Sequence, residues 1–282
     1  MIRTIKRYPI ATFFSLAFVL TWAVWVPRAA VSQGLLASDL PVVLGQVWTW
    51  APAVAAVLAA VLTGGRAALG ELGARLVRWR VGWTWYVVVI VGPAAFSLAV
   101  AGVYALLGGS WSSATPPALH GGSLVLLPLL LLILALTDGL GEELGWRGFA
   151  LPRLLARHGA IAASLIVGVL WALWHLPLLW TEGASIYQQP VWLLLVDVPA
   201  KSVIFTWVFL HTRGSVLLAV LLHAATNLFV VSPTLTDAGD PTLPIIAAAA
   251  KWTLVLVVML VAGPGLARDP RPETPSPRSR GK

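Results

Sequence analysis

The chain reads Thr137-Asp138-Gly139-Leu140-Gly141-Glu142-Glu143-Leu144-Gly145-Trp146-Arg147-Gly148-Phe149 directly after an apolar run, residues 124–136. Two adjacent carboxylates, Glu142 and Glu143, and one basic side chain, Arg147, therefore continue a segment that is apolar enough to enter a bilayer. Ionisable groups at membrane depth are costly, and they usually mark a functional site. This stretch predicts both a membrane protein and the place where its function lies.

The composition agrees with that interpretation. The 282 residues are 59% hydrophobic and only 11% charged, and their mean hydropathy is +0.86. Because a soluble domain of this size could not cover so much apolar surface, we expect an all-α, polytopic membrane bundle. No cysteine is present, so disulfides, a thiol nucleophile and thiolate metal ligands are excluded.

Apolar segments near the roughly 20 residues that a helix needs to cross a bilayer predict about eight transmembrane helices, at 9–31, 40–63, 83–108, 123–152, 160–180, 190–210, 214–231 and 244–262. Lys and Arg gather before the first segment and after the second, fourth, sixth and eighth, whereas the other connections carry almost none apart from Arg28. This alternation predicts that both termini are cytoplasmic, and it explains the net charge of +8 without nucleic acid.

The chain is expected to form one catalytic bundle over residues 1–262, because no polar linker interrupts it before Gly263. The motif-bearing core of that bundle is expected at about 123–231. Residues 66–80 carry arginines and spaced leucines, which predict an amphipathic piece at the cytoplasmic interface. The tail, residues 263–282, is basic, rich in proline and free of aromatic residues, so it is expected to be disordered.

The carboxylates reach the middle of the membrane if segment four is one long helix. With an inner boundary near Arg153, Glu142 lies about 16 Å above it at the helical rise of 1.5 Å per residue. By the same estimate His175 lies roughly 22 Å and His223 roughly 13 Å above the inner ends of their own helices. We therefore expect these three side chains to share one layer of the bundle, on a helix that tolerates its glycines because it is packed inside.

Glu143 and Arg147 are four residues apart with the acid first, so they can pair on one helix face. Glu142 points about 100° away and could stay unpaired. The plainer alternative is a structural ion pair with a spare carboxylate that binds backbone or water. Two acids with a single basic partner make that alternative awkward, because the second acid must be neutralised or used.

The later segments carry further polar residues at a spacing of four. Trp171 and His175 can stack, which would orient the imidazole, although a lone histidine is more often simply a core residue. His223 and Asn227 share one helix face; this favours a lined cavity, although polar residues on membrane helices also join neighbouring helices.

Segment six contains another acid and base four residues apart, Asp197 and Lys201. This spacing is interpreted as a neutralising pair that allows both side chains to be buried. Lys251 has no obvious partner in the sequence and is expected to extend toward the membrane surface.

Taken together, Glu-Glu-x-x-x-Arg, an aromatic-x-x-x-His and His-x-x-x-Asn occur in this order over residues 125–230. The arrangement resembles the CAAX protease and bacteriocin-processing family (CPBP, also Abi) of intramembrane endopeptidases. The words Trp174-His175-Leu176-Pro177 and Gly214-Ser215-Val216-Leu217-Leu218 are similar to those of bacterial members. The resemblance therefore implies an integral protein of a prokaryotic plasma membrane.

The resemblance implies that four residues on three helices are catalytic: Glu142, His175, His223 and Asn227. It implies structural support from Glu143 and Arg147. Trp171 departs from the family pattern, which usually has Phe at this position, yet it keeps an aromatic ring. The implied partners are the lipid bilayer and a protein or peptide substrate, which could be lipidated.

The mechanism that follows is peptide hydrolysis inside the bilayer. Glu142 would act as general base on a water held between it and His175, and His223 and Asn227 would donate hydrogen bonds to the oxyanion. A competing version places Zn²⁺ among Glu142, His175 and His223, although the chain lacks the H-E-x-x-H word that marks many zinc proteases. No cofactor is otherwise implied.

Two other classes of function remain open from the residues alone. A non-catalytic membrane protein of the same fold, for bacteriocin immunity or scaffolding, would keep the bundle without the chemistry. A transporter would use the buried acids as a proton or substrate path, but the ionisable residues are concentrated in the second half, and no internal symmetry is visible.

Overall fold

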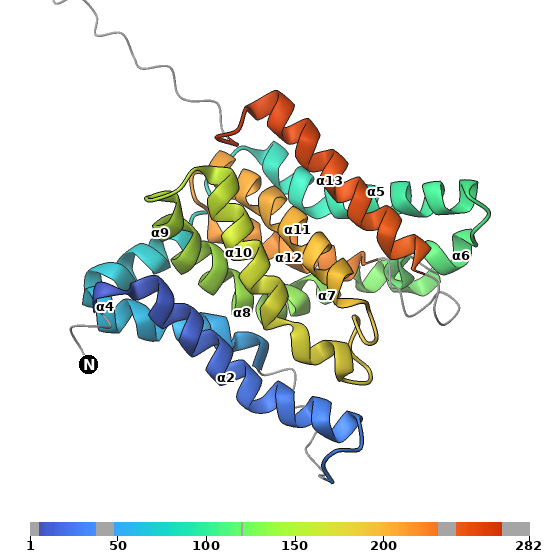
Figure 1. Ribbon diagram of the computed structural model, residues 1–282. Coiled ribbons are helices and arrows are strands. Elements are labelled where there is room, and N and C mark those ends of the chain that lie inside the picture. The colour runs from blue at the N-terminus through green and yellow to red at the C-terminus, as the bar shows by residue number, and fades with distance from the viewer. Residues whose placement is uncertain (1–5, 38–47, 120, 231–240, 267–282) are drawn as a thin grey trace, which may run out of the picture.

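The computed structural model describes residues 6–37, 48–119, 121–230 and 241–266. Within these ranges the regular secondary structure is helical throughout (Figure 1). Seven helical stretches are long and apolar enough to cross a membrane: Pro9–Ser32, Ala51–Leu76, Trp83–Leu106, Leu124–Leu155, Ala160–Trp180, Val191–His211 and Thr242–Ala262. The expected all-α polytopic bundle is confirmed.

The structure names these stretches as follows: α2 (Pro9–Ser32), α4 (Ala51–Leu76), α5 (Trp83–Leu106), α10 (Ala160–Trp174) with the 3₁₀ turn η6 (Leu176–Trp180), α11 (Val191–His211) and α13 (Thr242–Ala262). Short pieces are η1 (Trp48–Trp50), α6 (Trp111–Ala114), η2 (Pro117–Leu119) and η3 (Gly121–Leu126). The fourth span contains α7 (Leu127–Leu134), α8 (Leu140–Glu143) and α9 (Leu151–Leu155).

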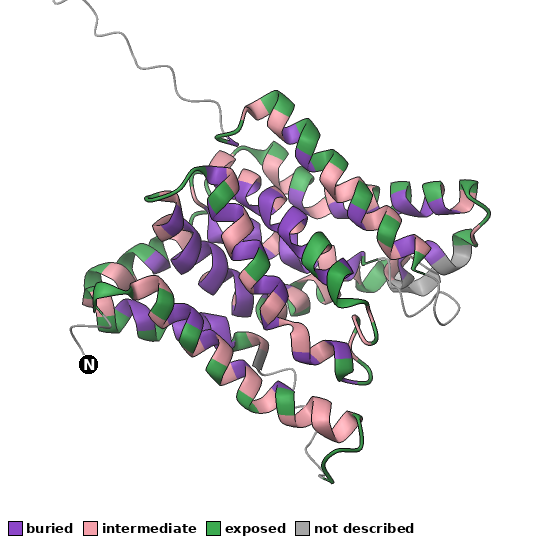
Figure 2. Cartoon of the chain, viewed as in Figure 1, coloured by how far each residue is buried: buried purple, intermediate pink, exposed green. Residues whose placement is uncertain are grey.

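The remaining apolar segment differs in length from the expectation. It forms α12 (Val216–Leu228), a helix of 13 residues, which at 1.5 Å per residue is about 20 Å long and shorter than a bilayer core. Its residues are mostly buried among other helices rather than exposed to lipid (Figure 2). Where about eight spans were expected, the described residues form seven helical stretches long enough to cross a membrane and one shorter inner helix.

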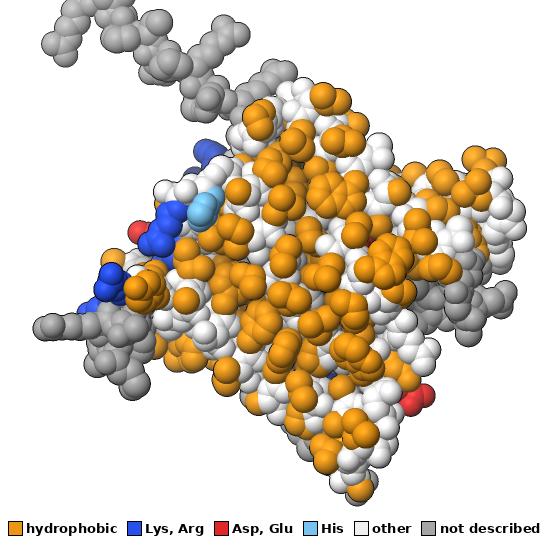
Figure 3. Space-filling model, viewed as in Figure 1, with side chains coloured by type: hydrophobic (Ala, Val, Ile, Leu, Met, Phe, Trp, Pro, Cys, Tyr) orange, Lys and Arg blue, Asp and Glu red, His pale blue; other side chains and the backbone are white. Residues whose placement is uncertain are grey.

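The helices are arranged around a central group. α2 packs on α4 at one side, α13 packs on α5 and α11 at the other, and α8, α10 and α12 lie between them (Figure 1). The outer helices expose large apolar side chains, for example Leu106, Val125 and Leu260, as expected of a protein whose surface contacts lipid. Figure 3 shows this apolar face, with Lys and Arg side chains gathered along one edge.

The fourth span is one continuous helical stretch, as expected, but its winding changes twice. Two π-helical stretches, η4 (Ala135–Gly139) and η5 (Leu144–Ala150), flank α8. Wider π turns alter which residues face the same side, and they often occur at functional sites. Here they surround the carboxylates of Glu142 and Glu143, both of which are buried.

Glycines let this span approach α4 closely. A Cβ atom at Gly141 would lie 2.6 Å from the backbone oxygen of Thr49, and a Cβ at Gly145 would lie 2.8 Å from the backbone oxygen of Pro52. Small residues four apart allow such close helix packing in membranes. The glycines thus place this face against η1 and α4, while the two carboxylates contact Trp171 of α10 and His223 of α12.

The helix α4 is interrupted where the amphipathic piece was expected to begin. Gly65 has φ 59° and ψ −143° inside it, a conformation that suits glycine because it has no Cβ. Beyond this break, Leu72 is buried against the bundle, whereas Val77 is exposed. Part of the expected second segment, residues 40–47, and most of the expected disordered tail, residues 267–282, lie outside the described residues.

Candidate active site

Glu142 is enclosed by two tryptophan side chains. Its Oε2 atom accepts hydrogen bonds from Trp171 Nε1 at 2.5 Å and from Trp146 Nε1 at 3.2 Å. Only 4% of the residue is exposed. Arg147 pairs with Glu143 and not with Glu142, which instead has two neutral N–H donors, both on one oxygen, and this leaves Oε1 for other contacts.

Glu143 and Arg147 form the expected ion pair. Arg147 Nη1 lies 3.0 Å from both carboxylate oxygens of Glu143, and neither side chain is exposed. Arg147 Nη2 also donates to Ser202 Oγ at 3.3 Å, and Ser202 Oγ donates in turn to the backbone oxygen of Ser164 at 2.8 Å. The guanidinium thus connects the fourth span with α11 and, through Ser202, with α10.

Aromatic rings complete the surroundings of this guanidinium. Arg147 Cζ lies 4.6 Å from the ring centroid of Trp171 and 4.6 Å from that of Phe205. A cation over an aromatic face is attracted by the ring quadrupole, most strongly when it is desolvated. The arginine is therefore stabilised by rings as well as by Glu143.

His223, on α12, is hydrogen-bonded to one carboxylate and lies near the other. Its Nδ1 is 2.8 Å from Glu143 Oε1, and its Nε2 is 3.9 Å from Glu142 Oε1. A carboxylate only accepts hydrogen bonds, so Nδ1 carries the proton that is donated to Glu143. Glu143 thereby orients the imidazole, and Nε2 faces the free oxygen of Glu142.

His175 ends α10, immediately before η6. Its Nδ1 is 2.9 Å from the backbone oxygen of Trp171, so Nδ1 is the protonated nitrogen because a carbonyl only accepts. The ring centroids of Trp171 and His175 are 6.1 Å apart, and the angle between the ring planes is 48°. The two rings are therefore in tilted contact and are not stacked in parallel. The backbone carbonyl, rather than the indole face, orients this imidazole.

Asn227 lies one turn beyond His223 on α12, as the spacing predicted. Its Nδ2 donates to Asp138 Oδ2 at 3.1 Å. Asp138 belongs to η4, and sequence reasoning assigned it no role. His223 and Asn227 therefore both contact acids of the fourth span, so they share one face of α12 as expected.

Sequence reasoning missed Asp138, Trp146 and Ser202 as members of this cluster. A signal existed for the first two, because Asp138 lies four residues before Glu142 and Trp146 lies four after it. No comparable signal existed for Ser202, which meets Arg147 only through the packing of α11 on the fourth span.

The zinc version of the site does not fit these side chains. Among the described residues, no group of three or more His, Asp or Glu side chains is arranged to hold a metal ion. His223 and His175 use Nδ1 for Glu143 and for the Trp171 carbonyl, which leaves both Nε2 atoms available, but these atoms do not converge with Glu142 into a set of three ligands. We therefore assign no step to a metal at Glu142, His175 and His223.

The second acid–base spacing gives a different result from the one expected. Asp197 is bonded to Lys251 of α13, and no ion pair between Asp197 and Lys201 occurs in the described part of the chain. Lys201 Nζ instead lies 5.6 Å from the ring centroid of Trp171. The expected Asp197–Lys201 pair and the expected outward extension of Lys251 were both wrong, because helix packing brings Lys251 to the carboxylate.

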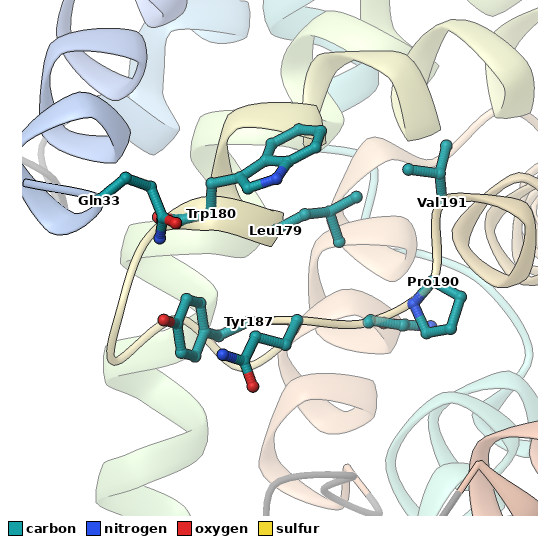
Figure 4. A pocket seen from close by; sticks show the side chains of 8 residues that line it. Gln33, Leu179, Trp180, Tyr187, Pro190 and Val191 are labelled. Carbon is teal, nitrogen blue, oxygen red and sulfur yellow. The ribbon is translucent and has the colours of Figure 1, made fainter. Parts of the chain in front are cut away.

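A hollow of about 350 Å³ opens near the end of α10, where η6 leads into α11. Figure 4 shows its lining side chains, which come from Gln33 and from the segment between Leu179 and Val191. No catalytic candidate lines it. The hollow is thus separate from the carboxylate cluster, although His175 lies four residues before Leu179.

Fold and site together define an integral membrane protein with a buried carboxylate–imidazole centre. Residues 124–229 match a family described as Type II CAAX prenyl endopeptidase Rce1-like. Over 106 residues the chain is 38% identical to CAAX prenyl protease 2 of Methanococcus maripaludis. This alignment covers 36% of this chain and 38% of that relative. This segment, which holds every candidate catalytic residue, is therefore similar to the CAAX protease family.

The matched segment spans less than two fifths of the relative's own length. It runs from the start of the fourth span to the end of α12. The helices α2, α4, α5 and α13 lie outside it.

Proposed function

We propose that the protein is an intramembrane endopeptidase of the CAAX type, which hydrolyses a peptide bond in a membrane-associated substrate. One observation carries this proposal: inside the segment that matches the family, Glu142 Oε1 and His223 Nε2 face each other at 3.9 Å. That separation is too long for a direct hydrogen bond, and a water to one side of the line could bind both atoms.

In the proposed reaction, Glu142 takes a proton from this water, whose oxygen attacks the carbonyl carbon of the scissile bond. Glu142 then gives the proton to the departing amine nitrogen as the C–N bond breaks. The 3.9 Å separation supports His223, rather than His175, as the second partner of the water. Glu143 and Arg147 keep the His223 ring in place, as the third group does in other base–orienter arrangements.

The oxyanion is assigned to Asn227. An amide nitrogen has two N–H donors, and one of them is used by Asp138, so the second remains for the developing negative charge. His223 donates from Nε2 only when it is protonated, because Nδ1–H is directed to Glu143. His175 has its Nε2 free as an acceptor at the edge of the same cluster.

The substrate we propose is a protein or peptide that ends in a prenylated Cys-aliphatic-aliphatic-X sequence. The matched family and the archaeal relative are both described as acting on CAAX prenyl substrates, and such sequences occur at the C-terminus, where they attach proteins to membranes. The bilayer is then the second partner. We place the protein in the plasma membrane of a prokaryote, since the relative is itself prokaryotic.

The test uses the full chain in lipid vesicles with a fluorescence-quenched farnesylated peptide that ends in Cys-Val-Ile-Met. We expect cleavage by the wild-type protein and a loss of at least about 100-fold in kcat/KM in Glu142→Gln, as for removal of a general base. Glu71→Gln is the matched control, because the Glu71 side chain is 66% exposed and lies in a surface pair with Arg75.

Undiminished cleavage by Glu142→Gln would remove Glu142 from the mechanism. If the wild-type protein does not cleave the peptide and proteomics of membrane peptides finds no product that depends on Glu142, a non-catalytic role of the same fold replaces the protease.

A further inference from the structure

Lys201 is a basic side chain beside the site that the proposed mechanism does not use. It lies on α11 one turn before Phe205, whose ring contacts Trp171 at 5.8 Å and His223 at 6.0 Å between centroids. Lys201 Nζ is 5.6 Å from the centroid of the same Trp171 ring that donates to Glu142. One indole therefore separates the ammonium group from the carboxylate of Glu142.

No anion in the described chain forms an ion pair or a hydrogen bond with this ammonium group, although Asp197 and Glu142 are near enough to attract it. Among the described residues Lys201 forms neither a hydrogen bond nor an ion pair. Its described polar contact is the cation–π contact with the Trp171 ring. Its neighbour on the helix, Asp197, is bonded to Lys251. One carboxylate between two lysines leaves a net charge of +1, half-buried at the middle of a membrane-spanning helix.

The acids of the site accept hydrogen bonds from groups other than Lys201. Glu142 Oε2 accepts from two tryptophans while its Oε1 faces His223, and Glu143 accepts from Arg147 and His223. A desolvated cation that has only an aromatic ring as partner is costly at membrane depth, and a bound anion would reduce that cost. Lys201 thus has the properties of a binding group for an anion that arrives with a ligand.

We propose that Lys201 binds a carboxylate of the substrate, beside the bond that Glu142 hydrolyses; this rests on the proposed protease function. A C-terminal Cys-aliphatic-aliphatic-X sequence has a free carboxylate three residues beyond the modified cysteine, which is about 10 Å of extended chain. An acidic side chain near the cleaved bond would offer the same chemistry. A lysine ammonium group is a point charge with three donors, which suits either source.

The experiment compares three farnesylated, fluorescence-quenched peptides with two variants of the full chain in lipid vesicles. The first peptide ends in a free carboxylate, the second in an amide, and the third in an amide with aspartate as its last residue. Lys201→Met removes the charge at similar length, and Lys201→Arg keeps it. The control for folding is the cleavage of the amide peptide, which has no carboxylate to lose.

For the acid peptide we expect Lys201→Met to lower kcat/KM by about 10- to 100-fold, the range for a hydrogen bond to a charged group. The loss should be mainly a rise in KM, and Lys201→Arg should restore most of it. The amide peptide should be cleaved equally by the wild-type protein and Lys201→Met. Cleavage of the aspartate peptide that depends on Lys201 would identify a side-chain carboxylate as a second ligand.

Equal cleavage of acid, amide and aspartate peptides by the wild-type protein would overturn this inference and leave the proposed protease intact. A Lys201→Met variant that still prefers the acid peptide as strongly as the wild-type protein would also overturn it. Absence of all cleavage by the wild-type protein, in contrast, would count against the protease itself.

Discussion

The molecule contains two acid–base pairs that look alike in the sequence and differ in space. Glu143 and Arg147 on the fourth span, and Asp197 and Lys201 on α11, are each four residues apart with the acid first. The first pair forms, with no exposed surface on either side chain. In the second, the acid is bonded to Lys251 of another helix. Equal spacing therefore does not give equal pairing.

The difference follows from the small energy of a pair within one helix. Such a pair contributes only about 0.2–0.5 kcal/mol in isolation, so contacts with other helices decide whether it forms. His223 and Ser202 hold Glu143 and Arg147 in their pairing geometry. α13 packs against α11 and brings Lys251 to Asp197, so Lys201 is left beside Trp171. The lesson is that spacing permits a pair and packing selects it.

The largest effect is expected where the buried pair is broken. Arg147→Met should leave Glu143 without its charged partner, and removal of one member of a buried ion pair costs about 3–5 kcal/mol. We expect a strongly lowered thermal stability in detergent, or loss of the accumulated protein. Lys201→Met is the comparison variant, and we expect it to change the unfolding temperature little. A similar loss in both variants would show that the two sites are equivalent.

The next effect concerns the glycines that bring the fourth span to α4. Gly145→Ala places a Cβ 2.8 Å from the backbone oxygen of Pro52, so the helices must separate, at a cost of about 1–3 kcal/mol. The helix α11 contains no glycine of its own, but α10 approaches it closely through Gly168, whose added Cβ would lie 2.6 Å from Pro199 Cα. Gly92→Ala on α5 is the control, because no atom lies within 4 Å of its added Cβ. The unfolding temperatures of Gly145→Ala and Gly92→Ala measure this cost. Equal temperatures would show that the close approach of the fourth span to α4 is not required.

A third test addresses the link between the two regions, Trp171. Trp171→Phe keeps a ring near Arg147 and Lys201 but removes the N–H that donates to Glu142. A hydrogen bond to a charged group is worth about 1.5–3 kcal/mol, so we expect kcat/KM to fall by about 10- to 100-fold. Wild-type activity in Trp171→Phe would mean that Trp146 alone positions the carboxylate.

The pairing itself can be measured with two double-mutant cycles of thermal stability. Substitutions Asp197→Asn and Lys251→Met should be coupled by about 0.5–1 kcal/mol, because the groups are in contact but 18% and 16% exposed. The cycle of Asp197→Asn with Lys201→Met should give less coupling. A larger coupling energy between Asp197 and Lys201 than between Asp197 and Lys251 would show that Lys201, the partner expected from the helical spacing, is the one that pairs with Asp197.

Metal removal is expected to have the smallest effect, because no three ligands converge in the described residues. Activity in lipid vesicles should survive a wash with a strong chelator. Elemental analysis of the washed, active sample should find zinc well below one ion per chain. Stoichiometric zinc that leaves together with activity would restore the metal version of the site.

Much of the fold could be predicted because hydropathy alone limits a chain in a bilayer. A run of about 20 apolar residues has few choices other than a spanning helix, and six of the seven observed spans lie within a few residues of the predicted ends. α4 is the exception, because it begins at Ala51 and continues past the broken position Gly65 to Leu76. The same reasoning overestimated the length of α12, because an apolar run does not show whether its surroundings are lipid or protein.

The sequence predicted which residues lie in the candidate site better than it predicted which of them contact one another. Glu142, Glu143, Arg147 and His223 do meet, but the nearest imidazole to Glu142 among the described contacts is His223 rather than His175. The π turns on either side of α8 change the direction in which each side chain points. Spacing rules for a regular α-helix do not account for such turns.

The sequence by itself determined that this chain is a helical membrane bundle, and it determined which helices carry the acids, imidazoles and amide. Both follow from local properties, namely apolar length and residue type. Only the tertiary structure decided that Glu142 is held by two indoles, that Asp197 pairs with Lys251, and that Lys201 stands next to the site. These outcomes depend on helices distant in the chain, whose contacts outweigh the few tenths of a kcal/mol that local spacing provides.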